Sequence, residues 1–125
     1  MIDVEVENRS GREVDEAAAV ELARSVLAGE GVGAGEVGLA FVEPDESRAL
    51  KLEHLGVDEA TDALAFPIDG VGVLPDGMPR QLGDVVVCPA VVVADWHGPL
   101  VHALLHLVGY DHGPEMEARE AVYAG

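Results

Sequence analysis

Hydrophobic and acidic residues alternate at the start of the chain, where residues 2–7 read IDVEVE. This two-residue alternation predicts a half-buried β-strand. In residues 15–31 the apolar positions instead recur every three or four residues, acidic residues lead, and glycines close the stretch, which predicts an amphipathic helix. Residues 37–43, with the sequence VGLAFVE, predict a second strand.

The middle of the chain repeats this order of patterns. Residues 46–56 predict a second helix, preceded by a turn at Pro44 and Asp45. Residues 61–68 predict a short strand that contains Pro67. Because proline cannot donate a hydrogen bond to a neighbouring strand, we expect this strand to lie at a sheet edge or to end at the proline.

The last third contains the most apolar strand and the most apolar helix. Glycines and prolines in residues 69–81 predict a loop or hairpin turn, and the valine run of residues 82–88 predicts a central strand. A helix is then expected from Pro99 to Val108, with Gly98 as its N-cap. The order β-α-β-α-β-β-α predicts an α+β or mixed α/β fold with a small sheet of about four strands.

The composition fits a single domain over residues 1–125. Hydrophobic residues make up 49% of the chain, and a chain of this length buries a core without cross-links. The only cysteine, Cys88, cannot form an intrachain disulfide, which favours a reducing compartment. The N-terminus has no secretory signal pattern, and no apolar run approaches the roughly 20 residues of a membrane span. We therefore expect a soluble cytoplasmic protein with no membrane partner.

The charge of the chain is strongly unbalanced. Twenty-four acidic residues against seven basic ones give a net charge of −17. Nucleic-acid-binding proteins usually carry a basic patch, because phosphate contacts dominate their affinity, so this balance argues against a general polyanion binder. The acidic excess favours a solvated surface, adaptation to high salt, or a basic protein partner.

Three of the five histidines lie in residues 102–112, HALLHLVGYDH. Residues four apart on a helix share a face, so His102 and His106 should project side by side. Gly109 allows the backbone to turn sharply, which would bring His112 back toward them. Zinc uses three neutral imidazoles and an open fourth position in catalytic sites. We therefore expect one Zn²⁺ per chain, bound through the Nε2 atoms of the three histidines.

The spacing H-x-x-x-H-x-x-G-x-x-H is also that of the metzincin proteases. Those enzymes place a glutamate directly after the first histidine as general base, and this chain has Ala103 there. Alanine cannot accept a proton, so the sequence argues against a metzincin peptidase mechanism.

The histidine stretch resembles the signature of the YbeY family of rRNA-maturation endoribonucleases, whose pattern is close to H-G-x-L-H-L-x-G-Y-D-H. Residues 61–67 (TDALAFP) and 82–88 (LGDVVVC) resemble two further motifs of that family, in the same order. The resemblance implies a mixed sheet with flanking helices and a zinc ion held by His102, His106 and His112. It also implies a role in 16S rRNA maturation and ribosome quality control.

The chain departs from the family pattern at several points. Ala103 replaces the usual glycine after the first histidine. The family arginine before the T-D pair, held to be important for activity, is absent from residues 52–60 (LEHLGVDEA), so Arg48 and Lys51 are the nearby substrate-binding candidates. The segment between residues 82–88 and the histidine helix is also shorter than usual.

Zinc lowers the pKa of bound water to about 7, so attack on an RNA phosphodiester would use either that water or an activated 2′-OH.

Four further residues have alternative interpretations. Asp111, beside the third histidine, would either orient an imidazole or cap the turn. Asp84 is either a turn residue at a strand end, which we favour, or a wall of the site. His54 and His97 are interpreted as surface residues, since neither has ligand spacing.

These observations leave three functional hypotheses. The first is a zinc-dependent, single-strand-specific endoribonuclease acting on 16S rRNA in the small ribosomal subunit. The second is a weakly active or non-catalytic ribosome-assembly factor that binds a basic ribosomal protein. The third is a metal hydrolase with a non-nucleic substrate. The three histidines favour the first hypothesis, and the missing arginine and the net charge of −17 favour the second. A basic groove beside the metal would separate these two, and the sequence leaves the oligomeric state open.

Overall fold

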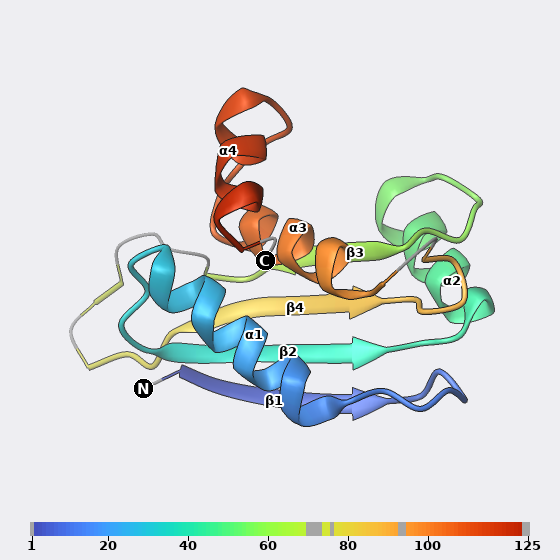
Figure 1. Ribbon diagram of the computed structural model, residues 1–125, viewed down its shortest axis with the longest axis horizontal. Coiled ribbons are helices and arrows are strands. Elements are labelled where there is room, and N and C mark those ends of the chain that lie inside the picture. Colours follow the sequence, from blue (N-terminus) through green and yellow to red (C-terminus); the bar gives the residue numbers. More distant parts are fainter. Residues whose placement is uncertain (1, 70–73, 76, 93–94, 124–125) are drawn as a thin grey trace.

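The computed structural model describes residues 2–69, 74–75, 77–92 and 95–123, which form one four-stranded sheet with helices packed around it (Figure 1). In chain order the elements are β1 (Ile2–Asn8), α1 (Glu16–Gly29), β2 (Gly35–Phe41), α2 (Pro44–Leu55), β3 (Ala63–Pro67), β4 (Gln81–Val87), α3 (His97–Leu107) and α4 (Pro114–Tyr123). No helix in these ranges is both long enough and apolar enough to cross a membrane.

The sheet is mixed, as the resemblance to the YbeY family implied. Its strands lie in the order β1-β2-β4-β3. The β1–β2 and β2–β4 pairs are parallel, and β3 runs antiparallel to β4. The valine-rich β4 is therefore central, and β3 lies at the edge, where Pro67 needs no partner on its outer side. In the predicted loop of residues 69–81, the described positions before β4 contain no strand or helix, and residues 70–73 and 76 lie outside the description.

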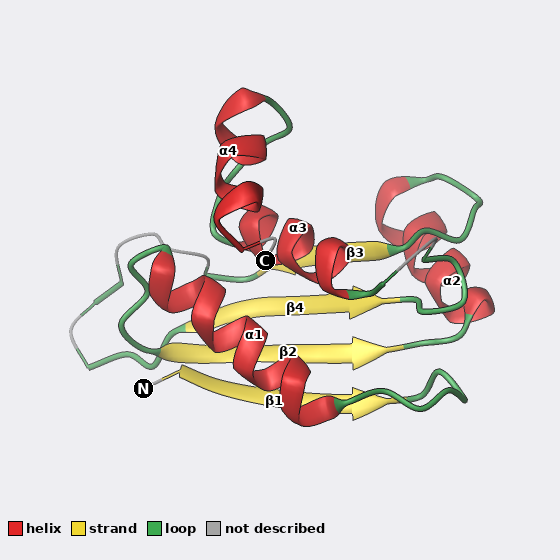
Figure 2. Cartoon of the chain, in the orientation of Figure 1, coloured by secondary structure: helices red, strands yellow, loops and turns green. Residues whose placement is uncertain are grey.

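One face of the sheet is covered by α1 and α3, which enclose the main core (Figure 2). The α3 helix contacts α1, α4 and the strands β3 and β4, which explains why it is apolar almost all round. Each leucine buried in this way stabilises the fold by roughly 1.5–3 kcal/mol. The α3 side chains with 1% exposure or less are Leu100, Leu104, Leu105 and Leu107. The helix that carries two of the histidines is therefore held on several sides.

The opposite face of the sheet is partly covered by α2. Val85 of β4 points into the main core, so the alternation along the strand places the neighbouring Asp84 on this opposite face. There Asp84 lies against Gly38 of β2. Both residues line a groove of about 770 Å³ to which Leu50 of α2 also contributes.

The α2 helix begins two residues earlier than predicted. Pro44 and Asp45, expected to form a separate turn, lie in its first helical turn instead. Proline fits there because its missing N–H group would have no partner within the helix. The helix ends as expected at Gly56, which has a positive φ of 72°.

The α3 helix also begins two residues early. Its first residue is His97 and the residue before it is Trp96, so the prediction of Gly98 as N-cap is wrong. The first four N–H groups of a helix have no partner within it, so Pro99 is accommodated at the third position as well as at the first. The N–H group of His97 is instead satisfied by Asp95 Oδ1, at 2.9 Å.

The α4 helix was missing from the predicted order of elements. Pro114 at its start and Glu115 and Glu117 in its first turn are recognisable helix-start signals. Only Met116 is buried on this helix, so residues 114–123 lack the apolar periodicity on which the prediction depended.

Candidate metal centre

The three clustered histidines converge at the C-terminal end of α3, as predicted. His102 and His106 lie on successive turns of the helix, and His112 follows it. One ring nitrogen from each residue lies within 4.8 Å of the other two. The Nε2 atoms of His102 and His106 are 3.1 Å apart. Among the described residues this is the one group of three or more histidine, cysteine or carboxylate side chains with metal-binding geometry.

A tight turn brings the third histidine back to the helix. Gly109 has a φ of 107°, a conformation that side chains disfavour. Its N–H group donates to the His106 carbonyl at 3.0 Å, and the Tyr110 N–H group donates to the Leu105 carbonyl at 3.0 Å. The helix is thus closed off within one turn, and His112 reaches the two helical histidines.

The Nδ1 atoms of the two helical histidines are held by acceptors. His102 Nδ1 lies 2.8 Å from Glu120 Oε1, and His106 Nδ1 lies 2.8 Å from the Tyr110 carbonyl oxygen. Because a carbonyl or carboxylate oxygen accepts, these contacts favour the tautomer in which Nδ1 carries the hydrogen and Nε2 presents its lone pair. This arrangement is typical of metal-binding histidines, whose second nitrogen is held by an outer hydrogen bond.

The donor set fits a metal ion. Burial lowers the pKa of His106 below its ordinary value, and the neighbouring histidines add to this, so the ring is neutral near pH 7. Two Nε2 lone pairs 3.1 Å apart repel each other unless a cation lies between them. Ligand nitrogens around a tetrahedral zinc are roughly 3.3 Å apart, given bonds of about 2.0–2.1 Å. The cluster is therefore consistent with a metal site.

The two aspartates considered as supporting residues are separated by the fold. Asp111 is next to His112, and its negative charge opposes the lowering of the His106 pKa that burial causes. Its proposed role in orienting an imidazole stays a prediction. Asp84 lies on the opposite face of the sheet from α3, in the groove beside α2, so the structure does not bring it to the histidines. The favoured interpretation of Asp84 as a turn residue at a strand end is wrong, because Asp84 lies within β4. Its alternative role as a wall of the site stays a prediction that this position does not support.

The predicted substrate-binding residues, Arg48 and Lys51, lie on α2. Arg48 Nη2 donates to Asp58 at 2.9 Å, and Lys51 Nζ donates to Glu59 at 2.7 Å. Carboxylates of the loop after α2 therefore engage both cations. Leu55, in the stretch that lacks the family arginine, lies at the end of the same helix and is 59% exposed. In Figure 1 α2 lies at the end of the sheet where β2 and β4 finish, and α4 stands toward the other end.

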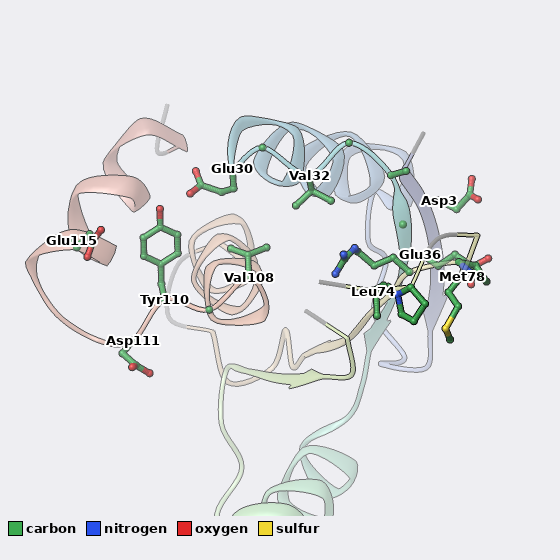
Figure 3. A pocket seen from close by; sticks show the side chains of 18 of the residues that line it. Asp3, Glu30, Val32, Glu36, Leu74, Met78, Val108, Tyr110, Asp111 and Glu115 are labelled. Carbon is green, nitrogen blue, oxygen red and sulfur yellow. The ribbon is translucent and has the colours of Figure 1, made fainter. Parts of the chain in front are cut away.

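A groove of about 1220 Å³ reaches the cluster through His112. Tyr110 and Asp111 line it on one side, and residues 31–36, which lead into β2, line it on another (Figure 3). Among the described lining residues Arg80 carries the one positive charge. The acidic lining residues are Asp3, Glu30, Glu36, Asp111 and Glu115. By its described lining residues, this groove is therefore acidic and is not the basic groove that would have favoured tight RNA binding.

Sequence reasoning missed Glu120 and the Tyr110 carbonyl as supports of the histidines. Glu120 lies on α4, which was not predicted, and backbone carbonyls leave no trace in a sequence pattern. The available signal was spacing: Glu120 follows Met116 by four residues, which places it on the inner face of a helix opened by Pro114.

Comparisons with known proteins identify the family of this chain. The family model described as "Endoribonuclease YbeY" matches residues 5–123. Proteins of that name from Salinispora tropica and Rubrobacter xylanophilus are each 34% identical, over 95% of this chain and 88% and 86% of their own lengths. The solution structure of TM1509 from Thermotoga maritima superposes with a TM-score of 0.57 at 25% identity, covering 98% of this chain and 86% of that one. With its three-histidine cluster, the chain belongs to the YbeY family of endoribonucleases, which are metal-dependent hydrolases.

Proposed function

We propose that this protein is a zinc-dependent endoribonuclease that cleaves single-stranded rRNA during 16S rRNA maturation and ribosome quality control in the cytoplasm. The observation that carries the proposal is the histidine cluster, in which His102 and His106 have their Nδ1 atoms fixed and their Nε2 atoms turned inward. Family membership supports an RNA substrate. The all-nitrogen set of three donors supports zinc, which favours this ligation in catalytic sites.

The residues of the site have different roles in this reaction. When bound, zinc supplies Lewis acidity toward a water molecule and a phosphoryl oxygen. Glu120 and the Tyr110 carbonyl hold the two helical imidazoles in the tautomer that presents Nε2. His112 is exposed and lines the groove, so an extended RNA strand would approach from that side. Arg80 lines the same groove, where a guanidinium is suited to hold a phosphate through two parallel hydrogen bonds.

A second function, assembly factor for a basic ribosomal protein, is favoured by the charge distribution. Five carboxylates and one guanidinium line the groove among the described residues, and Arg48 and Lys51 are paired with carboxylates. Such a surface repels a polyanion and attracts a basic one. The protein would then keep its metal-binding fold with weak or no cleavage activity. The third hypothesis, a non-nucleic substrate, gains no support from the groove or the family.

Cleavage of a single-stranded 16S rRNA fragment by the zinc-loaded protein tests the proposal. We expect cleavage by the wild type and its loss in His106→Ala, which removes a ligand. His97→Ala is the matched control, since His97 is an exposed histidine paired with Asp95 outside the cluster. Absence of cleavage by fully loaded wild type, together with binding of a basic ribosomal protein, would favour the assembly factor.

A further inference from the structure

The α4 helix is attached to the rest of the protein mainly by polar side chains. Met116 is its one buried residue, whereas helices usually dock through a stripe of several apolar side chains. The other inward-facing residues are Arg119, Glu120 and Tyr123, which are partly buried at helical spacing. The position of α4 therefore depends on what these three side chains contact.

Two of them converge on one carboxylate at the end of α1. The Glu30 side chain is 4% exposed and accepts from Arg119 Nε and Nη2 at 2.9 and 2.6 Å. The Tyr123 hydroxyl donates to the same carboxylate. Tyr123 also lies directly over Gly29, where a side chain would collide with its ring. This set of Glu30, Arg119 and Tyr123 is called the α1–α4 clamp below.

The clamp is linked to both acceptors that hold the helical histidines, to one through a neighbouring residue and to the other through a side-chain contact. Arg119 precedes Glu120, whose carboxylate holds His102 Nδ1. The Tyr110 phenol points toward Glu30 in Figure 3 and interacts with its carboxylate. The carbonyl of that same tyrosine holds His106 Nδ1. Glu30 thus contacts neither histidine but engages both segments that orient them.

We propose that Glu30 is a positioning residue of the metal centre, which acts through Arg119 on Glu120 and through the Tyr110 side chain on the carbonyl that holds His106. This inference rests on the proposed metal binding by the three histidines. Coupling between two sites is reciprocal. Metal binding should therefore also hold α4 against the body of the protein, because each ligated imidazole donates more strongly from Nδ1 to its acceptor.

The clamp is tested by zinc affinity together with amide hydrogen exchange in α4. Loss of an outer partner of a ligand typically weakens metal binding about 10- to 100-fold, and for Glu30→Gln, which acts one step further out, we expect about 10-fold. Exchange in residues 114–123 should be faster in this variant, and zinc should slow exchange there in the wild type. Asp58→Asn is the matched control, because it breaks the Arg48–Asp58 pair on α2 and should change neither quantity.

A double-mutant cycle separates positioning from general loosening. If Glu30 acts partly through Glu120, the zinc affinity of Glu30→Gln/Glu120→Ala should be higher than the sum of the two single effects predicts. Arg119→Lys, which keeps a positive charge, should lose less affinity than Arg119→Ala. Should Glu30→Gln not fold, Tyr123→Phe removes one clamp hydrogen bond and keeps the ring.

Three outcomes would overturn the inference, and they are distinguishable. One outcome is a folded Glu30→Gln or Tyr123→Phe variant that exchanges faster in α4 but binds zinc with unchanged affinity. That result would show that the clamp does not position the metal centre. Strict additivity in the cycle would overturn the part of the inference in which Glu30 acts through Arg119 on Glu120. Failure of the wild type to bind zinc at all would overturn the proposed function as well.

Discussion

At the scale of single residues, the site is built from outer partners as much as from ligands. The Nδ1 contacts of His102 and His106 decide the tautomer and hence which nitrogen faces the cluster. The positive charge available to substrate is also decided residue by residue. Arg48 and Lys51 pair with Asp58 and Glu59, and their role in substrate binding stays a prediction.

We expect substitutions of Arg80 and Arg48 to have different effects on kcat/KM. Arg80 lines the groove that reaches His112, so Arg80→Ala should lower kcat/KM on a single-stranded rRNA fragment by roughly 10-fold or more, since a charge-stabilising group is often worth 100-fold. Arg48→Ala should leave kcat/KM unchanged. Equal losses in the two variants, measured in parallel at one zinc concentration, would contradict the assignment of substrate binding to the groove.

We expect the Glu30 carboxylate to make the stability of the fold depend on pH in the acid range. Burial would raise the pKa of its carboxyl, but hydrogen bonds from Arg119 and Tyr123 outweigh it, and the pKa lies below the ordinary 4.5. Between the folded and unfolded pKa values the unfolded state binds more protons, so stability rises with pH there. The stabilisation is present above about pH 4.5 and is lost as the pH falls through the folded value.

The measurement for this prediction is the free energy of unfolding against pH for the wild type and Glu30→Gln. The difference between the two curves should be constant above pH 5 and shrink below 4.5, the ordinary pKa of a glutamate. A difference that stays constant to low pH would show that the Glu30 charge does not stabilise the fold.

At the scale of elements, predictability followed the hydrophobic pattern. β1, β2, β4 and α3 have clear alternation or long apolar runs, and these elements lie where the sequence placed them, within a few residues. α4 has one buried residue, Met116, and is held by polar contacts to α1 and α3, which no local pattern encodes. The histidine cluster was predictable because helix spacing and Gly109 fix it locally, whereas the position of Glu120 depends on how two helices dock.

The turn between α3 and α4 is sensitive to a single methyl group. Gly109 has a φ of 107°, and a Cβ there would meet no heavy atom within 4 Å. The cost of Gly109→Ala is therefore conformational, of order 1–3 kcal/mol for a residue held in a sparsely populated region. Chemical denaturation should show this loss, and zinc affinity should fall because His112 is displaced. A neutral effect on both would mean that the turn tolerates another backbone conformation.

At the scale of the whole molecule, the fold was predictable from the sequence. The location of the charges was not, because it depends on how the chain folds. The α+β class, the edge position of β3 and the histidine cluster follow from the order of patterns and a few spacings. The mixed sheet was implied by the family resemblance. A net charge of −17 says nothing about where the charges lie. The structure places five carboxylates along the groove next to His112, which opposes the approach of RNA.

This charge distribution predicts an unusual dependence on salt. The Debye length falls from about 30 Å at 0.01 M to about 10 Å at 0.1 M ionic strength, so added salt screens the repulsion between the groove and RNA. kcat/KM for rRNA cleavage should rise over this range of monovalent salt, opposite to the usual weakening of nucleic-acid binding. A steep fall of kcat/KM with salt would instead indicate a basic RNA-binding surface.

The central claim is that His102, His106 and His112 together bind one metal ion. Elemental analysis of protein purified without added metal, in the wild type and in His106→Ala, tests it most directly. The account predicts one zinc per chain in the wild type and little or none in the variant, because two remaining imidazoles do not complete a three-ligand site. Stoichiometric zinc retained in a folded His106→Ala variant would contradict it.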